Sequence, residues 1–130
     1  MNFESSPNGS SLPSYRFGSF ELDPSERRLK HDETGIELTP KAFDTLLLLV
    51  QNSSRLLEKE YFMRTLWPDS VVEEANLAHY ISQLRKVLQE KSPGEQFIET
   101  VPKVGYRFVA RVEVIPAVEP PAPGQLPRDE

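Results

Sequence analysis

The first third of the chain alternates apolar and polar positions with the two-residue period of a strand. This alternation runs from Tyr15 to Leu38, and Asp23-Pro24 and residues 32–35 within it are typical turn sequences. The pattern predicts a small antiparallel meander in this region.

Helical spacing replaces this alternation after the meander. Thr39 is a favoured N-cap and Pro40 suits the first helical position, so we expect a helix that ends near residues 52–54. A second, shorter helix is predicted over residues 59–67, because the proline at position 68 disfavours helix in the residue before it.

A third helix is predicted over residues 75–90, and its two faces differ sharply. The apolar residues that fall within one narrow stripe are Leu77, Ile81, Leu84 and Leu88. The opposite face and its borders carry Ala75, Asn76, His79, Ser82, Gln83, Arg85 and Lys86. Residues 75–89 contain no Asp or Glu. Most solvent-exposed helix faces, by contrast, do carry acidic side chains. This face is therefore suited to a polyanionic partner.

Two further strands, at residues 97–101 and 106–112, are predicted to form a β-hairpin around a Pro-Lys-Val-Gly turn. Pro102 is expected to stiffen the start of this turn, and Gly105 to supply a positive φ. Residues 100–112 carry Lys103 and two arginines but no acid, so the hairpin is basic.

The net charge of −5 at first disfavours a nucleic-acid partner. Residues 15–112, however, contain 14 Lys and Arg and 15 Asp and Glu, so most of the negative charge lies near the two ends. Binding to a polyanion depends on the local basic surface rather than on the total charge.

The composition also narrows the possible functions. The chain has no cysteine, and its two histidines are far apart, so we expect no metal site and no cofactor. There is no phosphate-binding loop and no nucleophile motif, so we expect that the protein is not an enzyme. No long apolar run or signal peptide is present, which predicts a cytoplasmic protein without membrane contact.

The ends of the chain differ in composition from its middle. Residues 1–14 are rich in Ser, Pro, Asn and Gly, and residues 115–130 contain five prolines. We therefore expect a disordered arm at 1–14, one folded domain at 15–114, and a proline-rich linker or tail at 115–130.

The third helix carries side chains that are able to recognise a DNA duplex. An α-helix fits the major groove, where Gln83 would pair with adenine and Arg85 or Lys86 would bind guanine or phosphate. Asn76, His79 and Ser82 would add polar contacts. The alternative is a protein-interaction module without DNA binding, because a fold does not determine a function. The near-neutral domain charge favours this alternative, whereas the acid-free helix face favours DNA.

Several motifs resemble a known family of regulators. Residues 72–88 (VEEANLAHYISQLRKVL) and 98–108 (IETVPKVGYRF) resemble the OmpR/PhoB-type winged-helix domain. FGSFEL at 17–22, LTP at 38–40 and LWP at 66–68 support the match. The sequence TVPKVGYRF is most similar to regulators of the CadC/ToxR sort, which carry this domain at the N-terminus.

This resemblance implies an α+β fold, a winged helix-turn-helix with an N-terminal four-stranded antiparallel sheet, three helices and a C-terminal hairpin wing. It implies a bacterial transcription regulator that binds specific double-stranded DNA. Helix 75–90 would enter the major groove, and wing 97–112 would contact adjacent backbone or the minor groove. Loop 68–74 would contact RNA polymerase, and two copies would bind direct repeats head to tail. The matching positions are Ala75, Asn76, His79, Ser82, Gln83, Arg85, Lys86, Thr100, Lys103, Tyr106 and Arg107.

The sequence departs from the family pattern in its basic residues. Related response regulators often carry arginine at the positions of Ala75, Ser82 and Gln83. Pro102 replaces a familiar arginine of the wing, and Lys103 follows it.

Overall fold

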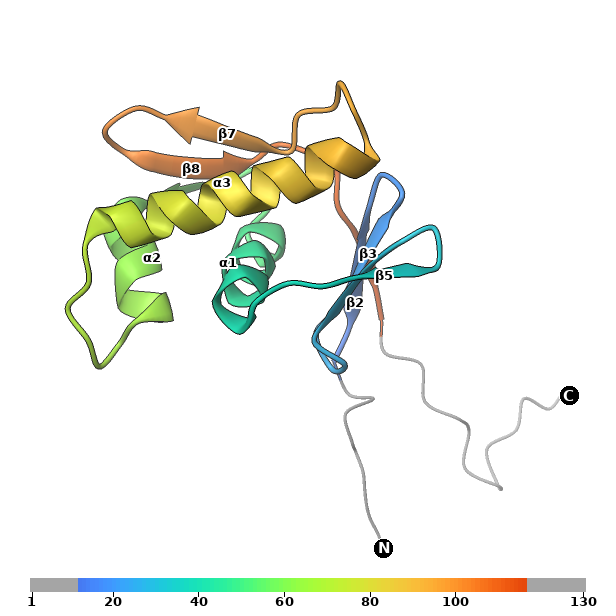
Figure 1. Cartoon of the computed structure of the whole chain (residues 1–130), viewed down its shortest axis with the longest axis horizontal. Helices are drawn as coiled ribbons and strands as arrows, with labels where there is room; N and C mark the ends of the chain where they lie inside the picture. The colour runs from blue at the N-terminus through green and yellow to red at the C-terminus, as the bar shows by residue number, and fades with distance from the viewer. Residues whose placement is uncertain (1–11, 117–130) are drawn as a thin grey trace, which may run out of the picture.

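The computed structural model describes residues 12–116, which form an α+β domain (Figure 1). The expected arm at 1–14 and tail at 115–130 therefore lie mostly outside the described residues. The elements, in chain order, are β2 (Ser14–Phe17), β3 (Phe20–Asp23), β4 (Arg28–His31), β5 (Thr34–Ile36), α1 (Pro40–Gln51), β6 (Leu56–Glu58), α2 (Lys59–Leu66), α3 (Glu74–Lys91), β7 (Ile98–Val101), β8 (Gly105–Phe108) and β9 (Glu113–Ile115).

The predicted N-terminal sheet is present, and within residues 12–116 it gains a fifth strand. Its order is β5-β4-β3-β2-β9, with antiparallel pairing throughout. Strand β9 follows the wing in sequence and pairs with β2, where Ser14 lies opposite Ile115. The two ends of the described chain therefore meet at this sheet, away from the wing in Figure 1.

The turns of the sheet follow the sequence signals, with one change of position. The Asp23 carboxylate accepts hydrogen bonds from the backbone N–H groups of Ser25 and Glu26, as expected for a turn begun by aspartate. The second turn is tighter than the predicted loop over 32–35. Asp32 and Glu33 both adopt positive φ, so strand β5 already begins at Thr34.

The first two helices begin where the sequence predicts. The Thr39 hydroxyl accepts a hydrogen bond from the backbone N–H of Ala42, and Pro40 is the first residue of α1. Helix α2 ends at Leu66, one residue earlier than expected, and Trp67 is its C-cap. The Trp67 ring is half-buried beside Tyr80, with ring centroids 6.1 Å apart, so Trp67 packs against the core.

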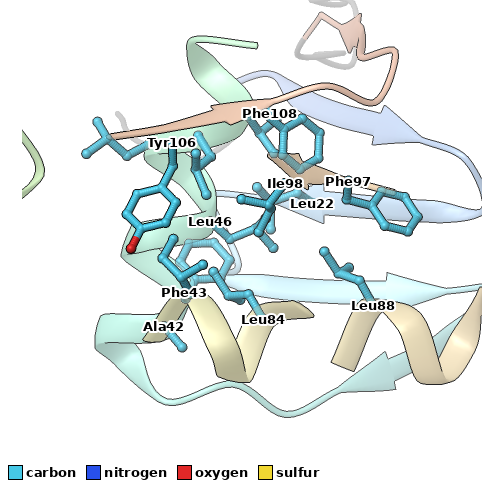
Figure 2. Close-up of a cluster of buried hydrophobic side chains, with 14 of the residues drawn as sticks. Leu22, Ala42, Phe43, Leu46, Leu84, Leu88, Phe97, Ile98, Tyr106 and Phe108 are labelled. Carbon is cyan, nitrogen blue, oxygen red and sulfur yellow. The ribbon is translucent and has the colours of Figure 1, made fainter. Parts of the chain in front are cut away.

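The core lies between the large sheet, α1, α3 and the wing (Figure 2). Leu84 and Leu88 of α3 point toward Ile98 and Phe97 in this view, and Leu22 comes from the large sheet. Burying each such leucine or phenylalanine contributes about 1.5–3 kcal/mol. This packing holds α3 by its apolar stripe and leaves its opposite face in solvent.

The predicted wing is a hairpin of β7 and β8, and β6 adds a third strand on the outer side of β8. The expected second wing strand, 106–112, is wrong in its extent. Strand β8 ends at Phe108, because the chain turns away there to bring β9 to the other sheet. The sheet, the helices and this hairpin together form a winged helix-turn-helix.

Candidate nucleic-acid interface

Helix α3 divides into a buried and an exposed face, as its sequence predicts. Leu77, Ile81, Leu84 and Leu88 are almost fully buried. The side chains exposed on the other side are Ala75, Asn76, Ala78, His79, Ser82 and Lys86. Gln83 is half-buried at the border. Ala78 was not among the predicted site residues, although it lies three residues after Ala75 and could have been found by that helical spacing.

The N-terminus of α3 begins one residue earlier than predicted, at Glu74. The Glu74 carboxylate lies 3.4 Å from Nζ of Lys59, which is the first residue of α2. Asn76 donates from its backbone N–H and from Nδ2 to the Glu73 carbonyl, at 2.9 and 3.3 Å. The Glu74 carboxylate is thus held in the first turn of α3, where the helix dipole favours negative charge.

Arg85 joins α3 to the wing instead of pointing freely outward. Its side chain is half-buried, and Nη2 donates hydrogen bonds to the Ile98 carbonyl, at 3.0 Å, and to the Thr100 hydroxyl. Two predicted contact residues, Arg85 and Thr100, are therefore bound to each other. The sequence does not reveal this pairing, because the partners are 13 and 15 residues apart and belong to different elements.

The tip of the wing carries Lys103 in an unusual backbone conformation. Its φ is 69°, in the left-handed region that most residues avoid. The tip is tied on both sides, because the backbone N–H of Val104 donates to Val101 and the backbone N–H of Lys59 donates to Val104, both at 3.0 Å. Lys103 is exposed, so the turn presents its ammonium group to solvent at the tip of the hairpin, whose strand β7 is bonded to α3 through Arg85.

The predicted role of Gly105 is wrong. The positive φ of this turn belongs to Lys103, and Gly105 is required for space instead. A Cβ added at Gly105 would lie 1.9 Å from the backbone oxygen of Leu57. The glycine therefore lets β6 and β8 approach closely.

Strand β8 sends its two predicted contact residues to opposite sides. The Tyr106 side chain is buried, and its ring packs edge-on against Phe62 with centroids 5.9 Å apart. Arg107 lies on the outer side of the hairpin, opposite Glu99, and Nη1 is 3.5 Å from the Glu99 carboxylate. Arg107 Nε is buried and finds no hydrogen-bond partner among the described residues. The acidic Glu99, one residue before the acid-free stretch, thus offsets part of the wing's charge.

We use the name α3–wing surface for the exposed face of α3 together with the exposed residues of the wing to which Arg85 bonds the helix. It comprises the exposed α3 side chains given above together with Thr100 and Lys103. The predicted loop 68–74 leads into α3, which already begins at Glu74, and Val71 within the loop is fully exposed.

Comparison with known proteins shows which family the chain belongs to. The family model described as "Transcriptional regulatory protein, C terminal" matches residues 32–108. The chain belongs to this family, the OmpR/PhoB type. The resemblance drawn from the sequence motifs is thereby confirmed.

Individual members of the OmpR/PhoB-type family show the extent of the likeness. The transcriptional activator CadC of Escherichia coli is 27% identical over 125 residues, which cover 88% of this chain and 24% of CadC. The transcriptional regulator HilA of Salmonella typhi is 33% identical over 95 residues, covering 73% of this chain and 16% of HilA. The solved DNA-binding domain of E. coli CadC superposes with a TM-score of 0.71 at 28% identity, over 79% of this chain and 97% of that domain.

The chain thus spans about a quarter or less of the length of these two relatives, which are transcription regulators. Within residues 12–116, no helix is both long enough and apolar enough to cross a membrane.

Proposed function

We propose that this domain binds specific sequences of double-stranded DNA as part of a bacterial transcription regulator that acts in the cytoplasm. Helix α3 enters the major groove, and the wing contacts adjacent backbone or the minor groove. In this proposal the predicted contact residues have different tasks. Ala75, Asn76, His79, Ser82 and Gln83 face bases, and Lys86 and Lys103 face phosphates.

One observation carries this proposal. The exposed face of α3 has no carboxylate from Ala75 to Gln89, and Arg85 bonds this helix to the wing, whose tip exposes Lys103. A carboxylate near phosphate costs free energy through like-charge repulsion, so an acid-free helix face is suited to a duplex. The solved DNA-binding domain of E. coli CadC shares the fold at 28% identity and supports the same assignment.

Three predicted contact residues act within the protein as well. Arg85 and Thr100 hold the wing against α3, and Tyr106 holds β8 against α2. The Arg107 side chain is able to contact phosphate only when its ion pair with Glu99 is broken. We therefore expect Arg85 and Tyr106 to contribute mainly by positioning, and the lysines by direct contact.

The test is binding of the full chain to a duplex selected from a random library, followed as a function of salt. Each lost phosphate contact should reduce the slope of log K against log salt by about 0.9. We expect this reduction for Lys86→Ala and for Lys103→Ala. Arg28→Gln removes an exposed charge on the large sheet and is the matched control, for which we expect no change.

The two possible failures have different meanings. If no duplex is enriched at low salt, the chain is an interaction module without DNA binding. If a duplex is enriched but both lysine variants keep the parental slope, DNA binding stands and the assigned surface is wrong.

Two finer features belong to the same proposal. The exposed loop 68–74 contacts RNA polymerase, and two copies bind direct repeats head to tail. The test of pairing is the binding of duplexes that carry one or two half-sites. Pairing predicts cooperative binding only to the repeat, and equal affinity per half-site on both duplexes would contradict it.

A further inference from the structure

The exposed face of α3 and its border carry side chains that complement A·T base pairs. Ala75 and Ala78 present methyl groups to solvent, and apolar side chains of this size pack against the C5-methyl group of thymine. Asn76 and Gln83 carry amides, which pair with the N6 and N7 atoms of adenine. Nδ2 of Asn76 keeps one proton for this contact, because the other is donated to the Glu73 carbonyl. In helix-turn-helix proteins the N-terminal residues of the recognition helix contact the base edges. These four residues therefore favour adenine and thymine, whereas Ser82 is able to contact either kind of base pair and His79 adds no preference for A·T.

The arginine of α3, Arg85, is not free to make the contact with guanine that is usual for this residue type. Arginine contacts the O6 and N7 atoms of guanine through two N–H groups at once. Both forks of the guanidinium, Nη1 with Nη2 and Nε with Nη2, include Nη2. In α3 the one arginine is Arg85, and its Nη2 already donates to the Ile98 carbonyl and to the Thr100 hydroxyl. Arg85 cannot form a two-pronged contact with guanine while it holds the wing.

The remaining cations of the α3–wing surface are lysines. Lys86 lies in the second half of α3, beyond the base-contacting turns, and Lys103 lies at the wing tip. A lysine ammonium is a compact point charge that suits phosphate rather than a planar fork. A-tracts have a narrow minor groove with a strong negative potential, which attracts cationic side chains such as that of Lys103.

We infer that this domain selects A·T-rich half-sites. This inference rests on the DNA binding proposed above and specifies its target. Ala75 and Ala78 contact thymine methyl groups, Asn76 and Gln83 pair with adenine, and Lys103 lies over a narrow minor groove. Arg85 sets the angle between helix and wing and does not choose a base.

The first experiment is selection of duplexes by the full chain from a library of balanced composition. Enrichment of A·T pairs in the half-site supports the inference. Enrichment of a motif with invariant G·C pairs would overturn it and leave DNA binding established. An absence of any enrichment would overturn the proposed function itself.

The second experiment tests the methyl contacts directly. Deoxyuridine replaces thymine in the selected site and removes only the C5-methyl group. Loss of one buried methyl should weaken binding about 4-fold, which is the conversion of about 0.8 kcal/mol. Deoxyuridine outside the half-site is the control. If every thymine of the half-site can be replaced without loss of affinity, the role of Ala75 and Ala78 is refuted.

The third experiment separates positioning from base contact at Arg85. Arg85→Lys keeps the charge but removes the fork that spans Ile98 and Thr100. We expect weaker binding to all duplexes with an unchanged base preference, whereas Gln83→Ala should relax the preference at one adenine. A change of base preference in Arg85→Lys at a G·C pair would show that Arg85 contacts that base, which would contradict the inference.

Discussion

Replacing Gly105 by alanine tests how closely the wing is packed onto β6. The added Cβ would lie 1.9 Å from the Leu57 oxygen, 2.8 Å from the Leu57 carbonyl carbon and 2.9 Å from Cα of Glu58. All three are backbone atoms, so no side chain can rotate to make room. Either β6 or β8 must move by about an ångström or more, as a carbon–oxygen contact of about 3.5 Å requires, and the pairing between them must open.

The cost follows from the contacts that this opening breaks. Strand β6 pairs with β8 through three residue pairs, and the backbone N–H of Lys59 donates to Val104 at their end. Loss of two or three hydrogen bonds costs about 2–3 kcal/mol, at about 1 kcal/mol for each bond. A compatible Gly→Ala change would instead gain about 0.4–1 kcal/mol, so the net effect is still destabilising. For a domain of this size we expect Tm to fall by about 5–20 °C.

The assay is thermal unfolding followed by circular dichroism, with Gly35→Ala as the matched control. Gly35 lies on edge strand β5 without a positive φ, and a Cβ there meets no atom within 4 Å. Gly35→Ala should therefore leave Tm unchanged or slightly higher. If Gly105→Ala unfolded at the same temperature as Gly35→Ala, the close approach of β6 and β8 would be refuted.

Three other substitutions test single features of the domain. Lys103→Gly removes a non-glycine residue from a left-handed conformation, so it should raise the free energy of unfolding in urea titrations by about 1 kcal/mol. The same variant should bind DNA more weakly, because the ammonium group is lost. An unchanged affinity for DNA would exclude Lys103 from the interface. Glu99→Gln should release Arg107 to phosphate and steepen the salt dependence of binding by about 0.9 in slope, and an unchanged slope would mean that Arg107 stays away from DNA. Thr39→Ala should lower the free energy of unfolding in urea titrations by about 1 kcal/mol, because the N-cap of α1 is lost. Thr39→Ser keeps a capping hydroxyl and should retain most of the stability. Equal stability of the parent and both variants would contradict the role of Thr39 as N-cap.

Local signals in the sequence were sufficient for most of the fold. Thr39-Pro40 marks the start of α1, and the stripe from Leu77 to Leu88 determines which face of α3 is buried. These features depend on residues within one or two turns of each other, and such short-range patterns are visible in a sequence. The exposed face of α3 could be predicted for the same reason, since it is the complement of the buried stripe.

Features that depend on distant partners were not predictable. Strands β6 and β9 have three residues each, too few for a periodic pattern, and each exists through pairing with a strand far along the chain. The role of Gly105 depends on Leu57, which lies on β6. Turn sequences suggested a positive φ for the glycine because they contain no information about the neighbouring strand.

The same reasoning explains why the sequence alone could not show which basic residues are available to contact DNA. Arg85 and Arg107 were counted with the lysines as cations facing DNA, but Arg85 bonds to the wing and Arg107 pairs with Glu99. Among these four residues only Lys86 and Lys103 are left without such a partner in the described part of the chain. Two phosphate contacts give a salt slope of only about −2 for one copy, well short of that of a tightly binding regulator. A domain with so little charge on its α3–wing surface gains affinity most directly by binding twice, which is why repeated half-sites are part of the proposal.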